Sequence, residues 1–163
     1  MTQTRWLTDD ERQAWLRLMA VTMLLPSRLE AELKRDAGLT HFEYYVLAMI
    51  SESQGRSAAL TSVAAKTNSS LSRLSHVIAR LEKNGFVTRC ASSTDGRTSI
   101  ATLTDAGWQK VVDSAPGHVD EVRSLVFDSL SPTQVTQLDD ICAQLLTTLD
   151  PEHRLLGIEN AEG

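Results

Sequence analysis

The feature that most constrains this chain is the order of structural signals within residues 53–104. A short helical pattern, a turn at Asn68 and an amphipathic pattern over residues 69–84 precede two alternating segments, FVTRC and TSIATL, which flank an Asp-Gly turn signal. A helix, a turn, a second helix and a hairpin in this order are typical of a winged helix-turn-helix. The sequence therefore predicts a mainly α fold with a small β-hairpin wing.

The charge of the chain is distributed unevenly. The formal net charge of the 163 residues is −5, yet residues 53–104 hold seven Lys or Arg against two Asp or Glu, a local charge of +5. The rest of the chain then carries −10. Because counterion release on binding nucleic acid depends on local charge, this segment is predicted to bind phosphate from within an acidic scaffold.

The polar face of the helix predicted at residues 69–84 carries small hydroxyls and bases with a single acid, Glu82. Small side chains allow a close approach to DNA, and arginine can contact guanine with two hydrogen bonds. The alternative is that this is an ordinary solvated helix face without a partner. The inward stripe predicted for the same helix is Leu71, Leu74, Val77, Ile78 and Leu81. With the turn and the hairpin, the predicted DNA-binding residues are Asn68, Ser69, Ser70, Ser72, Arg73, Ser75, His76, Arg80, Arg89 and Arg97.

Capping signals define the helices that come before and within this segment. Thr8 with Glu11 opens a long amphipathic helix over about residues 9–36, in which Pro26 predicts a kink. Thr40 with Glu43 opens a second helix that extends through residue 53. An extended piece over residues 56–60 leads to Thr61, the predicted N-cap of a short helix over residues 62–67.

Two further helices are predicted after the hairpin. One begins after Thr104 and is interrupted or bent at Pro116-Gly117, and the last opens at Ser131 with a capping box and runs through Leu149. Both ends of the chain carry apolar faces that one small domain would leave uncovered, so a second chain is expected to cover them. We expect one domain over residues 1–163, with a DNA-binding lobe at 53–104 and a helical dimerisation region at 8–37 and 105–150.

The run LTSVAAKTNSSLSRLSHVIARLEKNGFVTRCASSTDGRTSIATLTDAG resembles the DNA-binding lobe of the MarR family of bacterial transcriptional regulators. Its landmarks are RLEKNGFV, the wing turn of Asp95, Gly96 and Arg97, and the LTDAG that enters the next helix. Gly96 departs from the commonest wing, which has two consecutive basic residues after the aspartate. The resemblance implies a homodimer that binds palindromic double-stranded operator DNA, with recognition helices in successive major grooves and Arg97 at a minor groove.

The resemblance also implies that a small aromatic or phenolic acid releases the DNA and that the chain is a repressor. Candidate ligand residues near the junction of the dimer helices and the lobe are Trp15, Arg17, His41, Tyr44 and Tyr45. The alternative for each residue is an ordinary place in the core. Pockets of this kind are mostly apolar with a few convergent polar groups.

Other functions have less support in the sequence. The chain has no GxSxG, HExxH, P-loop or GxGxxG motif, so we expect neither an enzyme nor a cofactor. No metal site is expected, since His118 with Asp120 or Glu121 is better explained by exposed helix residues. One alternative function is a redox-responsive regulator that acts through Cys90. Otherwise the thiols of Cys90 and Cys142 are expected to be buried or idle. A second alternative is a winged-helix protein-interaction module.

The location of the chain is also an expectation. A polar, acidic start and the absence of a run of about eighteen apolar residues predict a cytoplasmic protein without a membrane partner.

Overall fold

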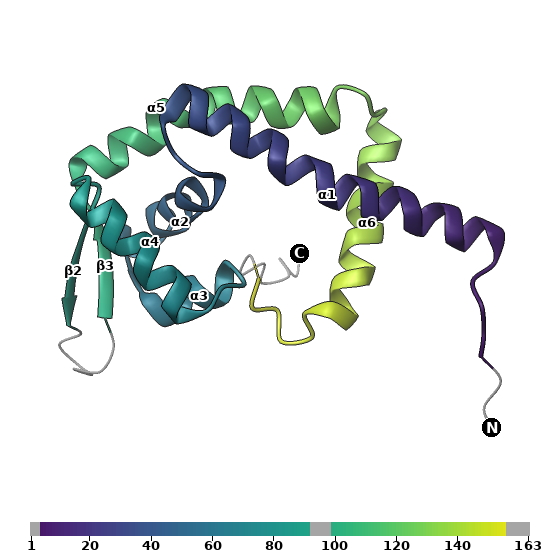
Figure 1. Ribbon diagram of the computed structural model, residues 1–163, viewed down its shortest axis with the longest axis horizontal. Helices are drawn as coiled ribbons and strands as arrows, with labels where there is room; N and C mark the ends of the chain where they lie inside the picture. Colours follow the sequence, from purple (N-terminus) through teal and green to yellow (C-terminus); the bar gives the residue numbers. More distant parts are fainter. Residues whose placement is uncertain (1–3, 92–98, 156–163) are drawn as a thin grey trace.

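The computed structural model describes residues 4–91 and 99–155, and its fold is mainly helical with one small antiparallel sheet (Figure 1). This confirms the predicted fold class. The helices α1 and α5 pack side by side, and α6 turns back toward α3. The elements in chain order are α1 (Asp9–Ala37), α2 (His41–Ser51), the 3-10 turn η1 (Gln54–Arg56), β1 (Ser57–Ala59), α3 (Leu60–Lys66), α4 (Leu71–Lys83), β2 (Val87–Ala91), β3 (Ser99–Leu103), α5 (Asp105–Val122), the π-helical segment η2 (Arg123–Phe127) and α6 (Pro132–Leu149).

The predicted capping boxes are confirmed at α1, α2 and α6. At α1 the Thr8 amide donates to Glu11 Oε2 at 2.7 Å, and the Glu11 amide donates to Thr8 Oγ1 at 3.2 Å. Helix α1 continues past Pro26 and ends at Gly38, whose φ of 66° is the left-handed conformation that glycine adopts without steric cost. Local side-chain chemistry therefore sets the ends of this long helix.

Two predicted boundaries are wrong. Helix α2 ends at Ser51 instead of residue 53, because the 3-10 turn η1 with Gly55 at φ 64° begins soon afterwards. Helix α3 begins at Leu60, and its N-cap is Ala59 without a side-chain hydrogen bond. Thr61 thus lies inside the helix and does not cap it, because the chain enters α3 directly from a paired strand.

Helix α5 corrects the prediction of an interruption at Pro116-Gly117. The helix runs unbroken through this pair, and the departure from α geometry comes later, in η2. Near its start α5 lies very close to the chain between α4 and β2, since a Cβ on Gly107 would overlap the Phe86 carbonyl oxygen. Only glycine permits this approach.

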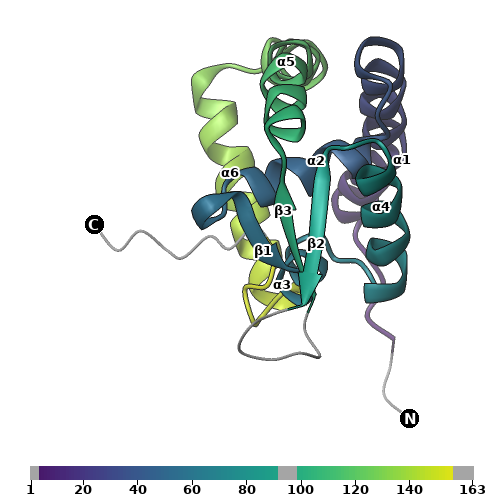
Figure 2. The ribbon, with the colours of Figure 1, turned by 90° about the vertical axis from the view of Figure 1, so that its left-hand side faces the viewer.

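The sheet has three strands in the order β1-β3-β2 (Figure 2). The predicted hairpin strands β2 and β3 pair with Val87 opposite Leu103. The extended piece was expected only as a connection, but its residues form β1, which pairs with β3 so that Ser57 faces Thr102. The two hydroxyl oxygens of that pair lie 2.8 Å apart.

One continuous core lies beneath the helix-turn-helix and the sheet. On α4, three of the five residues of the predicted inward stripe are fully buried and Val77 is half-buried. The prediction for Leu71 is wrong, because this first residue of α4 has no preceding helical turn to cover it and is 49% exposed. Helix α2 contributes to the same core, which comprises Leu33, Leu39, Tyr44, Val46, Leu47, Ile50, Leu60, Val63, Ala64, Leu74, Ile78, Leu81, Val87, Ala101, Leu103 and Val111.

Candidate nucleic-acid interface

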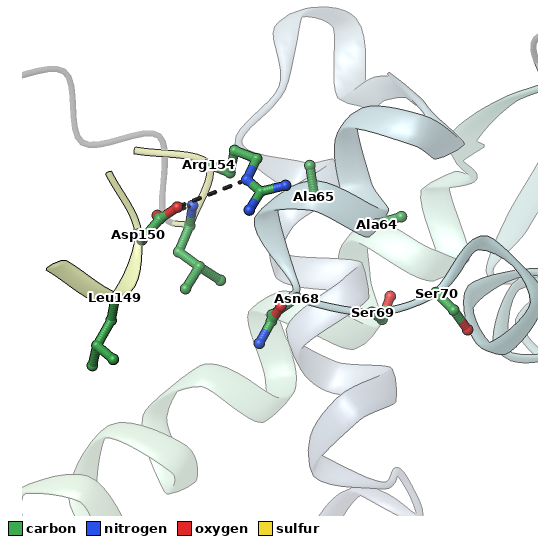
Figure 3. A pocket seen from close by; sticks show the side chains of 9 residues that line it. Ala64, Ala65, Asn68, Ser69, Ser70, Leu149, Asp150 and Arg154 are labelled. Carbon is green, nitrogen blue, oxygen red and sulfur yellow. Dashed lines mark hydrogen bonds and ion pairs between the residues drawn. The ribbon is translucent and has the colours of Figure 1, made fainter. Parts of the chain in front are cut away.

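The turn between α3 and α4 is built by short polar residues. Asn68 has a φ of 46°, as the predicted left-handed turn requires. Ser70 is the N-cap of α4, and its hydroxyl accepts a hydrogen bond from the Arg73 amide at 3.2 Å. The hydroxyl oxygens of Thr67 and Ser69, on either side of Asn68, are hydrogen-bonded at 3.0 Å. This turn fixes the start of α4 relative to α3 (Figure 3).

The polar face of α4 is open to solvent. Ser72, Arg73, His76 and Arg80 are exposed, and Ser75 is half-buried. Because Leu74, Ile78 and Leu81 face the core, the opposite side of the helix is left for a partner. An exposed helix with serines at its start and bases along its length has the chemistry that a DNA major groove accepts.

Each predicted DNA-binding arginine in the described part of the chain has a partner that sequence reasoning missed. The Arg73 guanidinium carbon lies 4.2 Å from the centre of the Phe42 ring. Two other arginines pair with carboxylates, the Nε of Arg80 with Glu43 at 2.9 Å and the terminal nitrogen of Arg89 with Glu82, also at 2.9 Å. Glu82 is only seven residues from Arg89, at the end of α4 where the chain turns back into β2, so its proximity in sequence could have suggested the last pair. Phe42 and Glu43 are too distant in sequence for any local pattern to show their partners.

The segment after α6 lies beside the helix-turn-helix and was not predicted as part of the interface. A hollow of about 320 Å³ separates the end of α6 from the α3–α4 turn (Figure 3). Asp150 organises this segment, because its carboxylate accepts a hydrogen bond from the Leu155 amide at 2.8 Å and lies 3.8 Å from Arg154 Nε. The bond from the Leu155 amide is the main reason that the pKa of Asp150 is lowered.

The structure describes the candidate ligand residues but not the residues of the predicted wing turn. Asp95, Gly96 and Arg97 lie outside the described residues. Within one chain the candidate ligand residues do not all meet. His41 contacts Glu30 on α1, whereas the exposed Trp15 lies fifteen residues earlier on the same helix, about 20 Å along its axis. Arg17 is likewise exposed on the early part of α1.

The three other candidate ligand residues lie on α2. Tyr45 is half-buried, and its hydroxyl donates to the Lys66 carbonyl oxygen at 3.3 Å. His41 is half-buried and Tyr44 is buried, and both rings face His118 of α5, with ring centres 5.9 and 4.7 Å away. Instead of joining Trp15 and Arg17, His41 and Tyr44 belong to a contact between α2 and α5.

The α1–α2–α5 junction contains a buried acid and a half-buried base. His118 Nδ1 lies 3.8 Å from Glu32 Oε2, and neither atom has a hydrogen-bond partner among the described residues. Burial lowers the pKa of His118 and His41, and the pKa of His41 is lowered further by His118. Burial raises the pKa of Glu32, to which the negative charges of Asp36 and Glu121 add. Glu32, His41 and His118 therefore each disfavour their charged form.

We predict that His118→Gln reduces the acid sensitivity of the fold. A histidine whose pKa in the folded state lies below 6.5 contributes its full stability above that pH and loses it as the pH falls toward the folded pKa. Glu32 has the opposite sign, because its raised pKa makes its contribution fall as the pH rises through that value. Melting temperatures measured between about pH 7.5 and 5.5 should fall less in the variant than in the wild type. Equal falls would contradict the assignment.

Metal and redox alternatives gain nothing from the geometry. Within residues 4–91 and 99–155, no group of three or more His, Cys, Asp or Glu side chains is placed to hold a metal ion. His118 is half-buried and not exposed as expected, because α1 and α2 pack over it. Cys90 and Cys142 are both free and exposed, so of the two expected states, buried or idle, the structure excludes burial.

Comparison with known proteins places this arrangement in a family. Residues 39–99 match the sequence model of the MarR family. Sco3205 of Streptomyces coelicolor, a MarR family transcriptional regulator solved in complex with DNA, is 41% identical over 91% of this chain and 93% of that chain, with a TM-score of 0.87. The chain belongs to the MarR family. It is thus a transcriptional regulator and not an enzyme.

Two further structures place this MarR family chain among its relatives. AbsC of Streptomyces coelicolor is 38% identical over 90% of this chain and 98% of that chain, with a TM-score of 0.84. CouR of Rhodococcus jostii, solved with p-coumaroyl-CoA, is 22% identical over 91% of this chain and 97% of that chain, with a TM-score of 0.72, and shares the fold. The comparison with curated proteins gave no match. In the described part of the chain, no helix is long and apolar enough to cross a membrane.

Proposed function

We propose that this MarR family regulator is a homodimeric repressor that binds a palindromic operator through α4 and the wing. The carrying observation is the exposed polar face of α4, which places Arg73 and His76 side by side on a helix whose other side is buried in the core. The DNA complex of Sco3205, at 41% identity, supports binding of double-stranded DNA by the present chain. Arg97 is proposed to contact a minor groove.

The dimer is supported by apolar side chains that one chain leaves uncovered. A groove of about 600 Å³ is lined mainly by α1, the π-helical segment η2 and α6, including Leu24, Leu125 and Ile141. Apolar exposure of this extent marks an interaction surface in a folded protein. The exposed large apolar residues on these elements are Trp15, Leu16, Leu18, Val21, Met23, Leu24, Leu125, Phe127, Leu138, Ile141, Leu145 and Leu149.

We predict a dimer at micromolar concentration, with half-sites about one helical turn of DNA apart. Sedimentation of the full chain measures the mass directly. Two variants on α6 are compared, Ile141→Glu in the groove and Asp139→Lys outside its lining. The comparison distinguishes the effect of a charge placed in the apolar groove on dimerisation from the effect of a charge change elsewhere on the same helix. The first should shift the equilibrium toward monomer, and the second should not. A stable wild-type monomer would contradict the proposal.

The division of the chain follows from the dimer proposal. We assign residues 53–104 to DNA binding and residues 8–37 and 105–150 to dimerisation. Release of DNA by a small aromatic or phenolic ligand stays a prediction of the family resemblance. Such a ligand can act only if it binds one spacing of the two recognition helices better than another.

Selection from a pool of random duplex DNA tests the proposed function. The full-length protein should enrich a palindromic motif, and the enriched duplex should bind more tightly than a scrambled one at the same salt concentration. Genomic fragments recovered with the protein then identify the promoter, and transcription from that promoter with and without the protein tests repression. Failure to enrich any sequence would favour the rival function, a winged-helix protein-interaction module.

A further inference from the structure

The first turn of α2 contacts both arginines on the exposed face of α4. The Phe42 ring lies beneath the Arg73 guanidinium at 4.2 Å, and Glu43 Oε1 lies 2.9 Å from Arg80 Nε. Phe42 and Glu43 are consecutive, and Arg73 and Arg80 lie about two helical turns apart on α4. A single turn of one helix therefore holds two cations of another.

The Glu43 carboxylate is fixed independently of Arg80. The side chain of Glu43 is only 2% exposed, and its Oε2 accepts a hydrogen bond from the Thr40 amide at 2.8 Å. The Thr40 hydroxyl in turn accepts from the Glu43 amide at 3.1 Å. Because this capping box holds the carboxylate in place, Arg80, which is largely exposed, takes its orientation from Glu43 and not the reverse.

Phe42 gives Arg73 a comparable support. The ring is half-buried and packs against the core, whereas Arg73 is exposed. A guanidinium stacked on a fixed aromatic ring has fewer accessible conformations than a free one. An arginine that is ordered before binding loses less conformational freedom when it contacts DNA.

We infer that Phe42 and Glu43 are positioning residues that order Arg73 for base contact and Arg80 for phosphate contact before DNA binds. This inference rests on the proposed function. Arg80 contacts Glu43 through Nε, and within the described residues its terminal nitrogens have no hydrogen bond, so they can donate to a phosphate. Arg73 has no carboxylate partner in the described part of the chain, and its guanidinium keeps its donors for a base edge.

The test uses the duplex enriched by the wild type and its single-base variants. Phe42→Leu removes the aromatic ring, whereas Phe42→Tyr keeps it as a matched control. Phe42→Leu should reduce discrimination at one base pair per half-site by about two- to fivefold, and Phe42→Tyr should retain it. A purely structural role for the ring would lower the melting temperature and leave the ratio of affinities unchanged.

Glu43→Gln tests the second contact. Glutamine can still accept from the Thr40 amide and so keeps the capping box, but it lacks the charge that holds Arg80. We expect a uniform loss of affinity across the base variants of about two- to fivefold, without loss of base preference. Glu30→Gln is the charge control, since Glu30 pairs with Lys34, accepts from the His41 amide and has no ion pair with α4 among the described residues.

Double variants decide whether these effects pass through the arginines. Phe42→Leu should change nothing further in an Arg73→Ala background, and Glu43→Gln nothing further in an Arg80→Ala background. Fully additive effects, or unchanged discrimination in Phe42→Leu, would overturn the positioning role. Phe42→Met replaces the leucine variant if that variant does not fold.

The outcomes separate this inference from the proposed function. If the wild type enriches no sequence, the proposed function fails and the positioning role falls with it. If the wild type enriches a motif and Arg73→Ala loses discrimination while Phe42→Leu keeps it, only the positioning role is overturned. Loss of discrimination in both variants, without additivity, supports both.

Discussion

Replacement of Leu74 by alanine is expected to lower the free energy of unfolding by about 2–5 kcal/mol. The side chain is fully buried where α4 packs against the core of the lobe. Truncation removes apolar contacts and leaves a cavity that rigid neighbours from several elements cannot fill. Denaturant unfolding at one fixed protein concentration measures the loss, since dimerisation would contribute to apparent stability.

Leu71→Ala on the same helix is the matched control. Leu71 is 49% exposed, so the same truncation should cost less than about 1 kcal/mol. Equal losses in the two variants would contradict the assignment of Leu74 to the core. Base preference should survive in Leu74→Ala wherever the variant is folded.

Two exposed residues on α4 should affect DNA binding and not stability. Arg73→Ala and His76→Ala should each weaken specific DNA binding by about 1–3 kcal/mol and relax discrimination at one base pair per half-site. Both side chains are exposed and lie outside the core, so melting temperatures should change little. Titration of the enriched duplex and of its single-base variants, at one salt concentration, measures both effects.

Lys83→Ala provides the control for loss of charge alone. This residue is exposed at the end of α4, and its loss should weaken binding to all duplexes similarly if it contacts phosphate. Unchanged affinity and unchanged base preference in both Arg73→Ala and His76→Ala would remove α4 as the reading helix.

The boundaries of the helices show where local sequence suffices. The boxes at Thr8, Thr40 and Ser131 and the left-handed turn at Asn68 were predicted because each forms between residues three or fewer positions apart. The start of α3 was misplaced because strand pairing, and not a cap, ends the preceding segment.

The chemistry of the interface divides in the same way. The sequence placed a basic, hydroxyl-rich face on α4, because the period of the apolar stripe leaves the other positions to solvent. It could not show that Phe42 and Glu43 hold Arg73 and Arg80, since these partners lie about thirty or more residues away and meet only when α2 packs on α4. Likewise it placed Trp15 near Tyr44, which the length of a single helix rules out within one chain.

By itself the sequence determined the helices, the three capping boxes, the paired strands of the hairpin, the basic face and the family, because periodicity, capping and turn chemistry act over a few residues. Only the tertiary structure decided that residues 57–59 form a third strand, that His118 meets Glu32 and Tyr44, and that the recognition arginines rest on α2. These contacts depend on which distant segments pack together. That choice is made by burial of the whole core, to which each segment contributes only a part.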